Sequence, residues 1–366
     1  MFYLFSRLSM ILIVLLVVAA CGTPAADTET ATDGATNDSA QQNEAVADES
    51  AEEDSDTANE TESGVAGETT DTEAASETEG LTFTDRSGAS ITLDQPAERI
   101  VCLSIACIDY LAELELTAVG IRSDFTEPYE AYFGTLPDDV TVLGGTAPEP
   151  DIEGIAALEP DLVIGVANFH EGLREALNTI APLYLQYPLT YQEAIDELTV
   201  VGRMTDREEQ ANAAADTFMQ KLDEYRTVAS GDPSVMILFA LSDTNYFVST
   251  DQEQSCTLFA ELADCPWGMP EQGGMMSVYG YAQYSLEQIV DNDPEHIFFA
   301  GFTGESDSST ALLTQFEQNP LWGSLSAVQN EQVYPVDVWL WTGERGTRML
   351  GIMLDEAMPI VYPDAA

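Results

Sequence analysis

The chain has 366 residues, of which 65 are acidic and 11 are basic, so its formal net charge at pH 7 is −54. A negative field of this size makes nucleic acid and anionic membrane surfaces poor partners. A strongly acidic exterior keeps a protein soluble in salt, so the composition is also compatible with a saline habitat.

The first twenty residues are predicted to be a secretory signal peptide. Arg7 supplies a positive charge, and residues 10–18 form an apolar run that is shorter than the about 20 residues a membrane-spanning helix needs. Small residues directly precede Cys21, as in a bacterial lipobox, which implies cleavage before Cys21 and lipid on its sulfur. More than one acyl chain would give stable anchoring. An ordinary signal peptide with an incidental cysteine is the alternative.

Residues 21–80 are predicted to form a solvated tether. From residue 22 to residue 80 the chain contains eighteen acidic residues but no basic and no aromatic residue. Such a segment cannot bury enough apolar surface to offset the entropy lost on ordering. The folded part is therefore expected to begin at residue 81, and its length suits two lobes of ordinary domain size.

Residues 81–203 are predicted to form a first α/β lobe. Alternating residues at 81–84 and 90–93 flank a polar turn and indicate a β-hairpin. Helices are expected at 108–116 and 151–158. Buried strands are expected at residues 99–104, 118–122, 140–143, 161–165 and 181–185. Strands that alternate with helices favour a parallel sheet.

One long helix, residues 204–230, is predicted to connect this lobe to a second one. Thr205 and Glu208 have the spacing of a capping box. From there to about Val228 the sequence contains no Gly or Pro, and small and apolar residues recur at helical spacing. The sequence Gly-Asp-Pro at 231–233 ends this run. We expect a rigid connector of roughly 35 Å rather than a loose hinge.

An internal repeat indicates that the second lobe, residues 231–366, is built like the first. Glu287 lies 134 positions after Glu153, and the segments around them align without a gap. Each copy has a short helix with an early glutamate, a Pro-acid turn and an apolar strand. Chance similarity between two αβ units is the alternative. The predicted fold class is α/β: two Rossmann-like lobes with parallel sheets, joined by one long α-helix, with a ligand cleft between the lobes.

Four cysteines remain once Cys21 is assigned to lipid. Disulfides persist in exported proteins, and Cys256 and Cys265 lie close together in a polar-flanked segment, so we expect them to form a disulfide. Cys102 and Cys107 are explained nearly as well by two buried thiols as by a second disulfide. No C-x₂-C spacing occurs, which argues against a zinc site.

Several segments match one family pattern in their order and spacing. They are residues 96–104, 144–165, 319–322, 327–334, 336–343 and 354–356. Together they resemble the substrate-binding lipoproteins of bacterial iron–siderophore and cobalamin ABC importers, and the resemblance covers about residues 81–363. Three positions depart from the pattern: Ile105 stands for a proline, Asp109 for a glutamate and Glu344 for a second glycine. These departures leave open which class of ligand the protein binds, and they bear less on the fold.

The resemblance implies a binding protein, not an enzyme, that captures an iron(III)–siderophore complex and delivers it to an ABC importer permease. We expect a monomer without a cofactor, lipid-anchored on the outer face of the cell membrane or in the periplasm. In this family one glutamate at the tip of each lobe pairs with permease arginines, and the matching positions are Glu153 and Glu287. Two exposed carboxylates that lie far apart on one face set the position and orientation in which the protein docks on a basic surface, more than they raise its affinity. The alternative is that each glutamate has no docking role and only stabilises the N-terminus of its own helix through its negative charge.

Ligands of open α/β sheets bind beyond the carboxyl ends of strands and at domain interfaces. Trp339 and Trp341 are expected on one side of an extended segment, facing the ligand, with Leu340 in the core. Aromatic rings beside an arginine suit a flat iron chelate, although core packing explains each ring about as well. The residues predicted to contact the ligand are Ser104, Arg122, Phe169, His170, Tyr187, Tyr246, Tyr279, Tyr281, Phe302, Trp339, Trp341 and Arg345.

The scarcity of basic residues favours a hydroxamate, mixed or citrate-poor chelate over a highly anionic one. Within the family, cobalamin or haem is the alternative ligand. A direct zinc or manganese binder would need several histidines, and the chain has only His170 and His296. An exported enzyme is a further class, but no G-x-S-x-G or H-E-x-x-H motif occurs. A glycosidase-like pair of carboxylates remains open in so acidic a chain.

Overall fold

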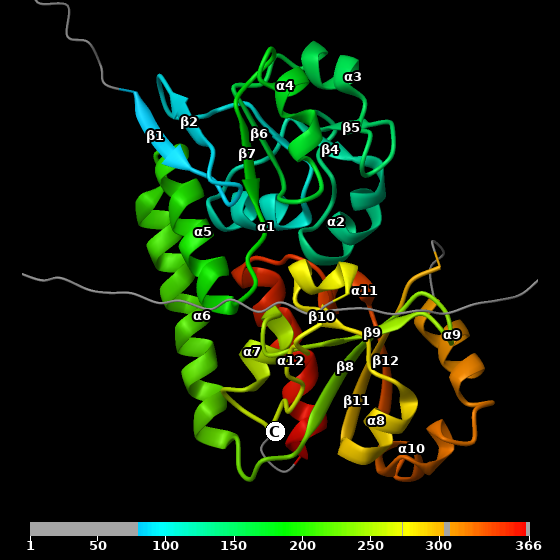
Figure 1. Cartoon of the computed structure of the whole chain (residues 1–366). Coiled ribbons are helices and arrows are strands. Elements are labelled where there is room, and N and C mark those ends of the chain that lie inside the picture. The colour runs from blue at the N-terminus through cyan, green and yellow to red at the C-terminus, as the bar shows by residue number, and fades with distance from the viewer. Residues whose placement is uncertain (1–79, 273, 304–307, 364–366) are drawn as a thin grey trace, which may run out of the picture. The chain divides into compact units, whose positions relative to one another are not determined.

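The computed structural model describes residues 80–272, 274–303 and 308–363. The predicted signal peptide, Cys21 with its predicted lipid and residues 22–79 of the predicted tether lie outside these residues. Two five-stranded sheets form the centres of two lobes (Figure 1). The predicted antiparallel hairpin is confirmed as β1 (Leu81–Thr84) with β2 (Ser90–Leu93), and it forms a separate two-stranded sheet at the start of the first lobe. Within the described ranges, no helix combines the length and the apolar character needed to cross a membrane.

The first lobe contains a parallel sheet in the order β5-β4-β3-β6-β7. Each predicted strand is confirmed to within two residues at either end. The strands are β3 (Ile100–Cys102), β4 (Gly120–Arg122), β5 (Thr141–Leu143), β6 (Leu162–Val166) and β7 (Leu183–Gln186). The helices are α1 (Ile105–Glu113), η1 (Ser123–Phe125), α2 (Thr126–Tyr132), α3 (Ile152–Ala157), η2 (Glu171–Leu173), α4 (Arg174–Leu177) and α5 (Tyr191–Met204).

The second lobe contains a mixed sheet in the order β10-β9-β8-β11-β12. Its strands are β8 (Val235–Ala240), β9 (Tyr246–Ser249), β10 (Tyr281–Ala282), β11 (His296–Gly301) and β12 (Val333–Val336). Its helices are α7 (Gln254–Phe259), η3 (Met275–Tyr279), α8 (Leu286–Asn292), α9 (Ser308–Phe316), η4 (Trp322–Ser324), α10 (Ser326–Gln329), α11 (Val338–Trp341) and α12 (Thr347–Val361). The prediction of a parallel sheet is wrong at β9, which is antiparallel to β8 and β10. The connection at 241–245 is too short for a parallel crossover and suits a hairpin.

The internal repeat in the sequence is also a repeat of local structure. α3 begins at the side-chain cap Asp151, and α8 begins at the side-chain cap Ser285. Each helix is followed by an acidic residue with a left-handed backbone, Glu159 with φ 46° and Asp293 with φ 45°. The strands that follow, β6 and β11, each lie next to the central strand of their sheet. The helix, turn and strand that the repeat predicted are thus present in both lobes, and the two αβ units also share caps and sheet positions.

A single long helix connects the lobes, but it begins later than predicted. α6 spans Glu208–Val228, 21 residues, which is about 32 Å at the usual helical rise; in Figure 1 it is drawn in green beside α5. The predicted capping box is wrong: the Thr205 hydroxyl donates to the carbonyl of Val201 at 2.8 Å and ends α5. Asp206, with φ 56°, turns the chain, and Arg207 makes no side-chain cap.

The last helix, α12, packs against α1 and α5 of the first lobe as well as against α6. The buried carboxylate of Asp109 on α1 accepts hydrogen bonds from the backbone N–H groups of Arg348 (3.2 Å) and Met349 (2.8 Å) at the start of α12. Arg348 also pairs with Glu113 of α1 at 2.9 Å. Burial raises the pKa of Asp109 to about 7. Asp109, which stands where the family pattern has a glutamate, thus caps the N-terminus of α12 from α1 at the lobe junction.

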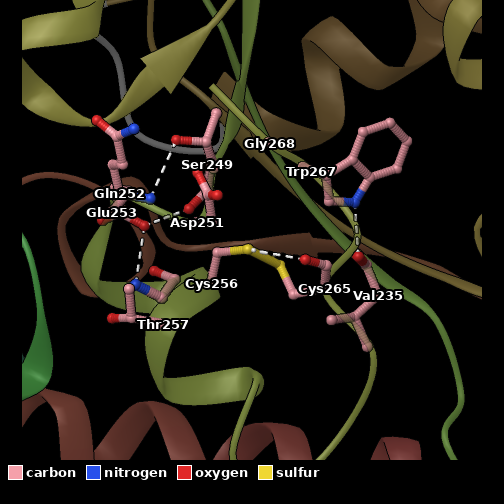
Figure 2. The surroundings of a disulfide bond; sticks show 12 residues. Val235, Ser249, Asp251, Gln252, Glu253, Cys256, Thr257, Cys265, Trp267 and Gly268 are labelled. Carbon is pink, nitrogen blue, oxygen red and sulfur yellow. Dashed lines mark hydrogen bonds between the residues drawn. A yellow bond between two sulfur atoms is a disulfide. The ribbon is translucent and has the colours of Figure 1, made fainter. Parts of the chain in front are cut away.

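The structure contains the predicted disulfide between Cys256 and Cys265 and a second one between Cys102 and Cys107, which the sequence had left open. The bond between Cys256 and Cys265 ties α7 to the segment that leads to Trp267, whose indole donates to the carbonyl of Val235 at 2.8 Å (Figure 2). The bond between Cys102 and Cys107 closes the turn from β3 into α1. That turn carries residues of the candidate site.

Candidate functional site

Side chains that follow the strands of both sheets meet at the junction of the two lobes. Tyr187, just after β7, lies 4.8 Å from Tyr279 of η3 between ring centroids. Phe125 of η1 lies 5.7 Å from Trp339 of α11 in an edge-to-face contact. Two aromatic pairs therefore bridge the lobes. We call the region around them the inter-lobe site, which comprises Ser104, Arg122, Phe125, Tyr187, Tyr279 and Trp339.

Ser104 lies at the floor of the inter-lobe site, buried at the carboxyl end of β3. Its hydroxyl oxygen accepts a hydrogen bond from the N–H of Cys107 (3.2 Å) and thereby caps α1. The side-chain amide of Gln186, at the end of β7, donates to the same oxygen at 2.5 Å. Ser104 therefore fixes the N-terminus of α1 at the site.

Arg122 lies at the end of β4 and is 8% exposed. Its Nε donates to Asp124 at 3.0 Å and its Nη1 donates to the carbonyl of Leu103 at 3.2 Å. The guanidinium also lies over the ring of Phe125, 4.4 Å from the centroid. Arg122 therefore lies beside Phe125 at the lobe junction, and its charge is balanced by Asp124.

Arg345 is fully buried and does not present its guanidinium to the junction. Its Nη2 donates to Glu253 at 2.5 Å and its Nη1 donates to the carbonyl of Leu340 at 3.2 Å. Glu253 also accepts hydrogen bonds from the N–H of Ser255 (2.8 Å) and the hydroxyl of Tyr281 (3.2 Å). Arg345 and Tyr281, both predicted as ligand contacts, thus form a buried polar network beneath the site.

The predicted extended segment through the two tryptophans is wrong. Asp337 accepts a hydrogen bond from the N–H of Leu340 at 3.0 Å and starts the helical turn α11. Successive side chains therefore do not alternate between two faces. Trp341 is fully buried, stacks on Phe298 at 4.3 Å and donates through Nε1 to Glu356 at 3.0 Å.

Trp339 remains half-buried and lies at the junction. Its ring also makes an edge-to-face contact with Phe302, 6.2 Å away, just past the end of β11. Phe302 is 40% exposed, and Phe169, which follows β6, is 41% exposed. These are the predicted aromatic residues that keep surface available beyond strand ends.

Two further predicted contacts belong to the interior of the lobes. His170 is fully buried: its Nδ1 accepts from the N–H of Val166 and its Nε2 donates to the carbonyl of Ala147, both at 2.9 Å. Burial lowers the pKa of His170, so the neutral ring holds the loop before α3. Tyr246 packs on Phe316 at 5.3 Å in the core of the second lobe. Neither side chain reaches the inter-lobe site.

Glu344, which was not predicted as a contact, lies on the loop between α11 and α12, directly before Arg345. Burial raises the pKa of Glu344, while the backbone N–H of Ile105 and the charges of Arg122 and Arg345 act in the opposite direction. Burial and then the charge of Glu344 raise the pKa of Tyr279. The one signal in the sequence was the departure from the family glycine at position 344.

A family model described as periplasmic binding protein matches residues 100–338. The match covers well over half of the chain. The chain belongs to the periplasmic binding protein family.

Named members of the family are similar to this chain over most of its length. The Fe(3+)-citrate-binding protein YfmC of Bacillus subtilis is 26% identical, covering 74% of this chain and 83% of the relative. The Fe(3+) dicitrate-binding periplasmic protein FecB of Escherichia coli is 29% identical, covering 70% and 82%. The solved structure of the triscatecholate siderophore binding protein FeuA from Bacillus subtilis, complexed with Ferri-Bacillibactin, is 20% identical and covers 77% of this chain and 98% of that chain. Its TM-score is 0.62, so the two share the fold.

In this periplasmic binding protein the matched glutamates are exposed and lie in different lobes (Figure 1). Glu153 is the second residue of α3 and Glu287 is the second residue of α8. Hydrogen bonds from its own backbone N–H and from Ser285 lower the pKa of Glu287, which keeps it ionised. Neither glutamate is part of the inter-lobe site.

Direct metal binding has no candidate in the part of the chain that the structure describes. Within that part, no three His, Cys, Asp or Glu side chains are grouped to hold a metal ion. His170, one of the two histidines, already has both ring nitrogens hydrogen-bonded. The inter-lobe site instead presents aromatic rings from both lobes.

Proposed function

We propose that this periplasmic binding protein captures a ferric siderophore outside the cytoplasm and delivers it to the permease of an ABC importer. The observation that carries the proposal is that strand-end side chains of both lobes converge on one site. Such a site suits a binding role, because ligands of two-lobed α/β proteins bind beyond strand ends and at domain interfaces. The similarity to ferric-citrate-binding and siderophore-binding proteins supports an iron chelate as the ligand.

The partly exposed rings at the junction, Trp339, Phe302 and Tyr279, give the ligand its apolar contacts, and the buried rings of Phe125 and Tyr187 support them. Phe125, Trp339 and Phe302 form a chain of edge-to-face rings on one side of the junction, and Tyr187 and Tyr279 form a pair on the other. A siderophore wraps iron in an organic shell, and aromatic rings bind such a shell through large contact areas. The iron needs no ligand from the protein, so the role is transport of a whole complex rather than catalysis.

Quenching of tryptophan fluorescence tests the proposal. A ferric siderophore added to the purified protein is expected to quench emission, and Trp339→Phe is expected to remove the largest part of the quenching because Trp339 lies at the junction. Trp341→Phe is the matched control, since Trp341 is buried against Phe298. Full quenching and unchanged affinity in Trp339→Phe would place the ligand elsewhere. The absence of binding across a panel of ferric siderophores would overturn the function.

Lipid anchoring through Cys21, with residues 1–20 as signal peptide and residues 21–80 as tether, belongs to the same proposal. Cys21→Ser is expected to release the protein from the membrane, because the modified sulfur is lost. Partition into detergent measures the effect, with the unmodified sequence as the reference. A variant that stays in the detergent phase like the parent would show that the anchor does not depend on this cysteine.

A further inference from the structure

The short helix η3 of the second lobe exposes an apolar face. Side chains three residues apart lie on the same face of a 3₁₀ helix. Met275 and Val278 share one such face and are 88% and 49% exposed, while Met276 and Tyr279 share the neighbouring face and are half-buried. We call the pair Met275 and Val278 the apolar lip.

Tyr279 places the apolar lip at the junction of the lobes. Its ring pairs with that of Tyr187 in the first lobe, and it packs against the apolar core of that lobe. One face of η3 therefore rests on the first lobe although the helix belongs to the second. Because Val278 directly precedes Tyr279, the exposed face is continuous with the inter-lobe site.

The C-terminal end of η3 is built into the second lobe. Gly280 has φ 83°, and a Cβ at this position would lie 2.2 Å from the carbonyl oxygen of Gln252, so glycine is required. The carbonyl of Gly280 accepts hydrogen bonds from the N–H (3.1 Å) and the hydroxyl (2.7 Å) of the buried Thr250. A fixed backbone thus presents the apolar lip to solvent.

The two arginines at and beneath the junction are already paired within the protein. Arg122 donates to Asp124 through both Nε and Nη2, and Arg345 pairs with Glu253 with almost no exposed surface. A cation that already holds a carboxylate gains little from a second anion. The affinity for a ligand at this junction therefore depends on apolar contact, which gains free energy with the apolar area removed from water.

We propose that the apolar lip is part of the ligand site and determines its specificity: Met275 and Val278 select ferric chelates whose organic shell carries hydrocarbon groups over chelates with a polar surface, such as ferric citrate. This inference rests on the proposed function. Methionine is unbranched and polarisable, so it packs against hydrocarbon groups of different shapes. Val278 is stiff at χ1 and gives the methionine a fixed neighbour.

Shape-conserving substitutions test the apolar character of the lip. The double variant Met275→Gln with Val278→Thr keeps the size of both side chains and makes them polar. Leu321→Asn is the matched control: Leu321 is 37% exposed and directly precedes η4, which packs on α8 and α10 rather than at the lobe junction. Since all three positions are exposed, the variants should fold like the parent, and circular dichroism with melting temperatures establishes this.

The probes are ferric dicitrate and two neutral trihydroxamates with the same iron centre, N-acetyl and N-octanoyl ferrioxamine B. Isothermal titration calorimetry measures their dissociation constants. The parent is expected to bind the octanoyl chelate about tenfold more tightly than the acetyl chelate, and both more tightly than ferric dicitrate. The double variant is expected to lower the octanoyl preference to about threefold or less, and Leu321→Asn is expected to keep it.

The outcomes separate the inference from the proposed function. Equal affinities of the parent for the two trihydroxamates, tighter binding of ferric dicitrate, or an undiminished octanoyl preference in the double variant overturns the role of the lip and leaves chelate capture standing. Unchanged affinities with lost cellular uptake would also overturn it, by assigning the lip to the permease. If none of the three probes binds, the inference is wrong; if no chelate of the wider ferric siderophore panel binds, the proposed function is wrong as well.

Discussion

Replacing Glu153 and Glu287 together by alanine is expected to stop cellular uptake of the iron chelate while its affinity for the purified protein stays within a few-fold. Both glutamates are exposed, each is the second residue of its helix, and neither contacts the inter-lobe site. Removing two charges that fix the orientation of docking should impair delivery and not capture. Uptake of radiolabelled iron by cells and titration of the purified variant measure the two effects separately.

The matched control is Asp291→Ala, which removes an exposed carboxylate from α8 without touching the repeated position. It should leave uptake intact. If the double variant loses ligand affinity by more than about tenfold, the two carboxylates act in ligand binding, and the docking role is wrong.

Replacing Arg345 by methionine is expected to lower the free energy of unfolding by about 3–5 kcal/mol. The change leaves the Glu253 carboxylate buried without its cation, and Glu253 is 2% exposed. The hydrogen bonds from Ser255 and Tyr281 remain but do not supply a balancing charge. Denaturant unfolding followed by circular dichroism measures the loss.

Two comparisons identify the cause of that loss. Arg86→Met breaks an ion pair with Glu193 whose side chains are 31% and 40% exposed, so it should cost no more than about 1 kcal/mol. The double variant Glu253→Gln with Arg345→Met should recover part of the stability, because no lone charge is left buried. Equal losses in Arg345→Met and Arg86→Met would show that burial of the pair has no consequence.

Most of the fold could be predicted because its determinants are local. The apolar runs that became β6 and β8 have almost no alternation, and this pattern indicates strands covered on both faces. The repeat around Glu153 and Glu287 predicted the same helix, turn and strand in both lobes, and the caps Asp151 and Ser285 occupy corresponding places. Each of these features depends on a few neighbouring residues.

The misreadings have equally specific causes. Alternation of Trp339 and Trp341 with Leu340 indicated a strand, but the side chain of Asp337 caps a helical turn at that point. A Thr-x-x-Glu spacing indicated a helix start, but Thr205 ends the preceding helix instead. In both places one side-chain hydrogen bond fixes a backbone conformation that differs from the one the sequence pattern indicated.

The site itself was only partly predictable. Position relative to strand ends identified Arg122, Tyr187, Tyr279 and Trp339, which do reach the lobe junction. It could not separate them from His170, which follows a strand but faces the interior. Arg345 meets Glu253 across 92 residues of sequence, so no local pattern could have paired them.

The optical spectrum of the protein, recovered with its ligand from cells grown under iron limitation, tests the central claim most directly. A ferric siderophore gives a broad charge-transfer band in the visible region, and the account predicts this band together with iron bound one to one. A corrin spectrum or a Soret band would show that the cargo is cobalamin or haem, and would contradict the assignment of a ferric siderophore.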